Sequence, residues 1–324
     1  MAAVTDSANG GESPLTAPRI DSHVHVFSRA SSEFPRQTSD HLPAEREEPV
    51  EKLLGEMESN GVDQAVLVQI GGSSLQYHAY LCHCLKEHPG RFRGIGLVPT
   101  GIHSMPEHMD RLADKGIVGF RLSSMGGPVD PLDPVDVRNC TTYPIWKRAA
   151  ERDYVLWLYP RAVDSHVVPF LLDAFPQVRV VFNHLMVCPG EGKLSIDDKG
   201  RPHVDVAMPP MTRYSTMGLK VGRLQENTRG LHQYENVCVH LSGQYAFSRE
   251  PWPYRDLADW HACLKFVFGS TRLMWATDFP WIVEDPGYAR LIPILDELLP
   301  DLSGAERADI MGGTASTFLR FPPL

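Results

Sequence analysis

Apolar runs of strand length alternate with segments of helical periodicity along most of the chain. Runs rich in β-branched and aromatic residues predict strands at residues 19–27, 63–70, 92–99, 117–123, 154–160, 178–185, 236–243 and 272–280. Apolar residues at helical spacing predict helices at 48–61, 75–90, 105–116, 143–153, 167–176, 213–231, 257–269, 288–300 and 304–319. Eight strand–helix units are what a (β/α)8 TIM barrel, an α/β fold, requires. A doubly wound open sheet would instead need a glycine-rich phosphate turn after the first strand, where this chain carries His-Val-His.

The alternation breaks once, at residues 187–211, which are rich in Gly, Pro and charged residues. Long connections of this kind are often functional, so we interpret the segment as a lid-like insertion. No change in composition divides the rest, and we predict a single catalytic barrel over residues 19–324. Residues 1–18 lack the apolar stretch of a signal peptide, and we expect a flexible N-terminal tail.

Composition and charge argue against some classes of binding partner. The 324 residues carry a formal net charge of −9 and no basic run, which argues against nucleic-acid binding. No stretch of 18 apolar residues is present, so no membrane span is expected. The 6 cysteines are scattered, which is typical of reduced thiols in a cytoplasmic protein. The sequence leaves open whether the chain forms a homo-oligomer.

Polar residues stand where the predicted strands end, which in a TIM barrel is the catalytic face. In the first strand Asp21, His23 and His25 alternate and should project to one side. Burying two histidines there without partners would be costly, which favours a functional role. The other strand ends supply Arg121, Ser123, Tyr159, His184, Ser242 and Asp278. Two of these have ordinary alternatives, since Asp278 could cap a helix near Pro280 and Arg121 could form a structural ion pair.

Histidines outside the strands are expected to be solvated, because they fall on helices or flanking turns. These are His78, His83, His88, His103 and His108.

Three motifs, "DSHVHVF", "FNHL" and "WATDFPW", occur in order at the first, sixth and eighth strands. Three further motifs lie between or after these: "GIVGFRLS", "VHLSG" and "RADIMGGTASTFL". Together, the motifs resemble those of the amidohydrolase superfamily, in its amidohydrolase 2 branch. The chain looks most like the hydrolases of 2-pyrone-4,6-dicarboxylate and of sugar lactones. Many metal-dependent members carry a lysine at strand four or a histidine at strand five, where this chain has Arg121 and Tyr159.

The resemblance implies a hydrolase that opens a lactone of a small carboxylated substrate. Asp278 would activate water, and His23, His25 and His184 would polarise the carbonyl. Arg121 would bind the substrate carboxylate in a bidentate fork, with Tyr159, Ser123 and Ser242 as further substrate contacts.

The cofactor and the reaction class stay open at this point. One zinc ion on His23, His25 and Asp278 would keep the open position of a catalytic site, and metal-independent hydrolysis is an equal alternative. A metal-dependent, non-oxidative decarboxylase of the same family and a non-catalytic barrel that binds a small acid are the other candidates.

Overall fold

Eight parallel strands form the centre of the molecule, as the alternating pattern predicts. The structure is a computed structural model, and it describes residues 17–101, 103–190, 192–206 and 230–323. In spatial order the strands are β1 (Ile20–Val24), β2 (Gln64–Val68), β3 (Phe92–Leu97), β4 (Ile117–Leu122), β5 (Val155–Leu158), β6 (Val180–Phe182), β9 (Val237–Leu241) and β10 (Leu273–Trp275). Each strand pairs in parallel with the next, so all carboxyl ends point to one face.

Two backbone hydrogen bonds bring the ends of β10 and β1 together and nearly close the barrel. The Asp278 N–H donates to the His23 carbonyl at 3.1 Å, and the His25 N–H donates to the Phe279 carbonyl at 2.7 Å. The (β/α)8 prediction is therefore confirmed. The same bonds place the histidine strand directly beside Asp278.

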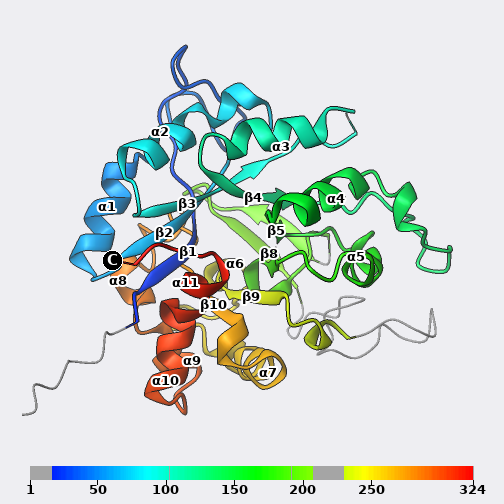
Figure 1. Ribbon diagram of the computed structural model, residues 1–324. Helices are drawn as coiled ribbons and strands as arrows, with labels where there is room; N and C mark the ends of the chain where they lie inside the picture. Colours follow the sequence, from blue (N-terminus) through cyan, green and yellow to red (C-terminus); the bar gives the residue numbers. More distant parts are fainter. Residues whose placement is uncertain (1–16, 102, 191, 207–229, 324) are drawn as a thin grey trace, which may run out of the picture.

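Helices surround the strands, as Figure 1 shows. They are α1 (Val50–Ser59), α2 (Ala79–Glu87), α3 (Met105–Ala113), α4 (Tyr143–Arg152), α5 (Val168–Ala174), α6 (Gln244–Phe247), α7 (Ala258–Phe268), α8 (Tyr288–Leu291), α9 (Ile294–Leu298), α10 (Gly304–Ala308) and α11 (Thr314–Phe318). Short 3-10 turns lie at Leu75–His78, Val137–Asn139, Ser165–Val167, His184–Met186, Leu231–Gln233, Arg255–Leu257 and Ser270–Arg272. Two predicted helices are interrupted, one at Pro293 and one by a π-helical turn at Asp309–Gly313.

Side chains from alternate strand positions fill the barrel interior, while the others pack against the helices. A register irregularity in β1 between Asp21 and Val24 changes this alternation. Ile20 packs in the interior cluster, whereas the Asp21 carboxylate accepts hydrogen bonds from Thr277 and from Tyr288 of α8. The expectation that Asp21 shares a side with His23 and His25 is therefore wrong.

The insertion at 187–211 contains an antiparallel hairpin, β7 (Lys193–Ile196) paired with β8 (Pro202–Asp205). An ion pair from Arg201 to Asp285 at 3.3 Å ties the hairpin to the segment after β10. Another, from Arg249 to Asp205 at 2.7 Å, ties it to the segment after α6. The predicted tail up to residue 16, the end of the insertion from 207 and most of the predicted helix at 213–231 lie outside the described residues.

Two histidines of the helix layer are buried, which corrects the prediction that all of them are solvated. His78 is 0% and His108 is 7% exposed. His78 donates through Nδ1 to the Ser74 carbonyl and accepts the Leu97 N–H at Nε2, so it joins a helix to the end of β3. In the part of the chain that the structure describes, no helix has the length and apolar character needed to cross a membrane.

Candidate active site

A cavity of about 300 Å³ opens at the carboxyl ends of the strands. Its polar lining comes from five different strand ends and α6: His25, Arg121, Tyr159, His184, Tyr245 and Asp278. Leu194, Pro202 and Val204 of the β7–β8 hairpin line the same cavity. The lid-like insertion therefore forms a wall of the cavity to which the predicted residues converge.

Asp278 has one occupied and one open carboxylate oxygen. Oδ2 accepts the Tyr245 hydroxyl at 2.8 Å. Oδ1 is buried and has no hydrogen-bond partner among the described residues, although it lies 3.6 Å from Nε2 of His25 and 3.8 Å from Nε2 of His23. Burial by itself raises the pKa of Asp278, but His184, His25 and the Tyr245 hydrogen bond outweigh it and lower the pKa below its usual value. Asp278 is therefore ionised at neutral pH, with a lone pair available.

Trp157 determines which nitrogen of His23 carries the proton. The Trp157 Nε1–H lies 3.0 Å from Nδ1 of His23, and both side chains are fully buried. An indole N–H can only donate, so Nδ1 of His23 must accept. Burial lowers the pKa of His23 well below its usual value, so the ring is neutral. Its single proton therefore lies on Nε2, which faces Asp278 Oδ1.

His25 has the opposite tautomer. Its Nδ1 lies 2.8 Å from the Val68 carbonyl oxygen, which can only accept, so Nδ1 carries the proton. The other ring nitrogen, Nε2, faces the cavity beside Asp278. The two histidines of the first strand therefore direct Nε2 toward the same carboxylate oxygen, while their Nδ1 atoms are bonded in opposite senses.

His184 is held between Ser242 and Arg121. Nδ1 lies 3.0 Å from the Ser242 hydroxyl, and Nε2 lies 3.5 Å from Nη2 of Arg121. Burial lowers the pKa of His184 to about 4, against the opposing effect of Asp278, and the Arg121 charge adds to the lowering. His184 is therefore neutral at neutral pH.

The backbone at two of these residues adopts the left-handed region, which side chains other than glycine seldom occupy. His184 has φ of 48° and Asp278 has φ of 62°. Such conformations cost free energy and are concentrated at functional sites. Both residues are thus held in place by their surroundings rather than by local preference.

Arg121 has no carboxylate within ion-pair distance in the described parts of the chain. Its guanidinium lies 5.2 Å from the ring centroid of Tyr159, which orients it by a cation–π contact. It lines the cavity with donors to spare. The structural ion pair considered as an alternative from the sequence is absent there.

Two of the predicted substrate contacts lie elsewhere. Ser123 is exposed and does not belong to the described lining of the cavity. Ser242 is fully buried and reaches the cavity only through His184, which it positions.

Sequence reasoning missed two residues of the site. Trp157 stands two positions before Tyr159, so the same period-2 argument that selects Tyr159 could have placed it on the interior face. Tyr245 lies on α6, a four-residue helix directly after β9, and its sequence neighbourhood gives no comparable signal.

The comparison with known protein families identifies the family of the chain. The family model for Amidohydrolase (Amidohydro_2) matches residues 20–321. The chain belongs to the amidohydrolase family. No curated protein sequence matched it.

Several solved structures share the fold of this chain. A proposed 2-pyrone-4,6-dicarboxylic acid hydrolase from Pseudomonas putida is 22% identical, with 96% of this chain and 100% of the other covered and a TM-score of 0.66. A zinc-bound amidohydrolase from Burkholderia multivorans is 18% identical, with 94% and 100% covered and a TM-score of 0.68. The 5-carboxyvanillate decarboxylase of Sphingomonas paucimobilis is 15% identical, with 94% and 100% covered and a TM-score of 0.63.

The chain also has a group of side chains of the kind that binds zinc. Ligand atoms of His23, His184 and Asp278 lie within 4.8 Å of one another, whereas the sequence predicted His25 in place of His184. A ligating histidine normally donates its other N–H to an acceptor. His23 is bonded in the opposite sense, because Trp157 donates to Nδ1 and leaves the proton on Nε2, the atom that would ligate. His23 therefore does not fit as a ligand, and the described residues contain no second group of three.

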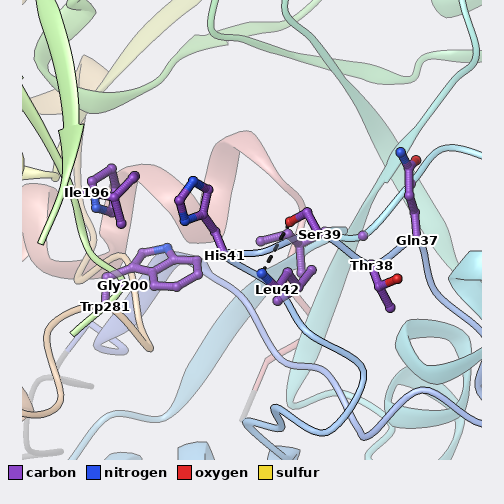
Figure 2. Close-up of a pocket in the computed structure, with 12 residues that line it drawn as sticks. Gln37, Thr38, Ser39, His41, Leu42, Ile196, Gly200 and Trp281 are labelled. Carbon is purple, nitrogen blue, oxygen red and sulfur yellow. Dashed lines mark hydrogen bonds between the residues drawn. The ribbon is translucent and has the colours of Figure 1, made fainter. Parts of the chain in front are cut away.

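A second pocket adjoins this cavity. It measures about 340 Å³ and shares three lining residues with the cavity: Ile70, Pro202 and Trp281. Figure 2 shows Ile196, His41 and Trp281 at one end and Gln37 and Thr38 at the other. We call the two spaces the inner cavity and the outer pocket.

Proposed function

We propose that this amidohydrolase opens the lactone ring of a small carboxylated substrate, with Asp278 as the base and without a metal ion. The observation that carries the proposal is the open Oδ1 of Asp278. It is ionised, has no hydrogen-bond partner among the described residues, and lies 3.8 Å from the Nε2–H donor of His23 and 3.6 Å from Nε2 of His25, which the proposal takes as an acceptor. Lactone hydrolysis needs an oriented water molecule and a base within hydrogen-bond reach of it, and these three groups provide both.

The complementary tautomers define how a water would be held at this place. It would accept the Nε2–H of His23 and donate one hydrogen to Asp278 Oδ1 and the other to Nε2 of His25. Its remaining lone pair would then be free to attack. In this arrangement His23 orients the nucleophile, a different role from the carbonyl polarisation that the sequence suggests.

Arg121 supplies the binding charge. Its guanidinium, which forms no ion pair with the described residues, would bind the substrate carboxylate, with the Tyr159 ring fixing its plane. His184 accepts at Nε2 from Arg121 and so keeps the guanidinium directed into the cavity. The positive charge also lowers the energy of the negative oxygen that forms during attack.

The bonds and protons balance without a further reactant. Water adds to the carbonyl carbon while its proton passes to Asp278. The ring C–O bond then breaks, and the same proton passes to the departing oxygen. The product is a hydroxy acid, and Asp278 returns to its ionised form.

A panel of lactones that carry one carboxylate tests the proposal. We expect ring opening, followed by chromatography, with turnover that persists after treatment with a metal chelator. Release of CO2 without ring opening would indicate a decarboxylase instead. Saturable binding of the acids with neither product would indicate a non-catalytic barrel.

A further inference from the structure

The outer pocket is enclosed by a loop that is built around a buried arginine. Arg36 is 9% exposed, and its guanidinium donates to backbone carbonyls. The acceptors lie on both sides of it in the sequence: Ser28, Leu42, Pro43, Ala44 and Arg46. A second tie, from the Gln37 N–H to the Gly71 carbonyl at 2.6 Å, fastens the loop to the segment after β2. The wall of the outer pocket is therefore a preorganised structure.

The opposite wall is fixed as well. The Arg46 guanidinium lies 4.9 Å from the ring centroid of Trp281 and donates to the His41 carbonyl at 3.1 Å. These contacts hold Trp281, which separates the two spaces, against the loop. Figure 2 shows Trp281 below His41 in the outer pocket.

One face of the β7–β8 hairpin lines both the inner cavity and the outer pocket. Along β7, Leu194 lines the inner cavity and Ile196, two residues on, lines the outer pocket. Side chains two residues apart on a strand lie on the same face, separated by about 6 to 7 Å. Pro202 of β8 lines both spaces. Leu194 is 61% exposed, so this apolar face is available for contact.

The chemistry of the outer pocket differs from that of the inner cavity. Its lining combines the hydroxyl, amide and imidazole groups of Gln37, Thr38, Ser39 and His41 with apolar side chains such as Ile196 and Trp281. Among the described residues that line it, none is an acid, a lysine or an arginine. Arg36 directs its donors to backbone carbonyls. Such a lining suits an uncharged ring that carries hydroxyl groups.

We infer that the outer pocket binds the distal arm of the substrate, a neutral hydroxylated ring attached to the lactone whose carboxylate lies on Arg121. The inference rests on the proposed function for the position of the lactone. The volume of about 340 Å³ is ample for one such ring. The amidohydrolase would then prefer lactones with an aryl or sugar-like arm to the bare ring acid.

Equilibrium binding of two unreactive analogues tests this inference independently of turnover. The probes are tetrahydrofuran-2-carboxylate and its 4-(4-hydroxyphenyl) derivative, which carries the arm away from the position of the lactone carbonyl, and their binding is measured by titration calorimetry. We expect the arylated probe to bind the wild-type protein at least tenfold more tightly. Ile196→Trp fills the outer pocket and should reduce this ratio to about one. Ser195→Trp is the matched control, because Ser195 is exposed on the opposite face of β7 and should keep the ratio.

Each outcome bears on a different claim. Equal binding of the two probes to the wild-type protein, or a ratio that Ile196→Trp leaves unchanged, would overturn the outer-pocket inference alone. Failure of both probes to bind would overturn the Arg121 carboxylate anchor and the inference with it. A preserved ratio in a protein that opens no lactone would support the pocket and contradict the proposed function.

Discussion

The indole N–H of Trp157 donates to Nδ1 of His23 at 3.0 Å, deep inside the barrel. The contact joins β5 to β1 beneath the cavity. Because the donor cannot accept, it fixes the only proton of the neutral imidazole on the atom that faces Asp278. A residue that never touches the cavity thereby decides whether the first histidine acts as a hydrogen-bond donor or as a metal ligand.

Replacement of Trp157 by Phe should release this tautomer. We expect the ¹⁵N shifts of the His23 ring to change from a pure Nε2–H form to a mixture of both tautomers. The turnover number should fall about tenfold, since His23 would hold the nucleophile only part of the time, while KM changes little. The free energy of unfolding should fall by roughly 1–3 kcal/mol, because Nδ1 is left buried without a donor.

Trp146→Phe is the matched control for this variant. Trp146 is also fully buried, but its Nε1 has no hydrogen-bond partner among the described residues. The substitution removes a similar volume without touching His23. A His23 spectrum that stays unchanged in Trp157→Phe would contradict the tautomer assignment.

Bound metal provides a second prediction. If Trp157 excludes His23 as a ligand, the purified wild-type protein should hold far less than one zinc per chain and should keep its activity after dialysis against a chelator. Trp157→Phe should gain measurable zinc affinity, since Nε2 becomes free in one tautomer. Loss of wild-type activity on chelation, with recovery on added zinc, would show that the metal-free mechanism is wrong.

The sequence predicts the strands and the polar residues at their ends because both depend on short-range patterns. Alternation along β1 and β5 and the parallel order of the strands suffice to bring His25, Tyr159, His184 and Asp278 to one mouth. The place of a polar residue along a strand can thus be predicted from one sequence.

The sequence does not predict the features that depend on contacts between distant segments of the chain. The irregularity in β1 that turns Asp21 toward Tyr288 has no signature in the alternating pattern. The Trp157–His23 bond spans 134 residues and depends on two side-chain rotamers. His78 reads as a helix residue, and only the fold shows that it bonds the end of β3.

Arg121→Lys should weaken binding of an acidic substrate more than a conserved charge suggests. A lysine cannot offer the planar pair of donors that a carboxylate accepts, and it lacks the stacking contact with Tyr159. We expect KM for a carboxylated lactone to rise at least tenfold, with a smaller effect on the corresponding neutral ester. An unchanged KM for the acid would remove Arg121 as the anchor.

Acid should destabilise the protein through histidines that are buried in neutral form. Burial lowers the pKa of His261 to about 4 and that of His78 to about 4, from an ordinary value of 6.5. Below pH 6.5 the unfolded chain binds a proton at each site and the folded chain does not, so stability falls as the pH drops from 6.5 toward 4. Each histidine contributes a slope of up to about 1.4 kcal/mol per pH unit in this window.

Denaturant titrations of His261→Gln across that window measure the effect. In His261→Gln the free energy of unfolding should depend less steeply on pH, because one buried histidine no longer contributes. His103→Gln, on an exposed turn, should show the same pH dependence as the wild type. Parallel pH profiles for His261→Gln and wild type would contradict the account of its burial.

The turnover number of Asp278→Asn tests the central claim most directly. The amide keeps the shape of the side chain but cannot take a proton, so kcat on a carboxylated lactone should fall by roughly 10²–10⁴. KM should change little, because the lost interaction belongs to the transition state. Circular dichroism would confirm that the variant is folded. A folded Asp278→Asn protein with near-normal kcat would contradict Asp278 as the base and, with it, the proposed hydrolysis.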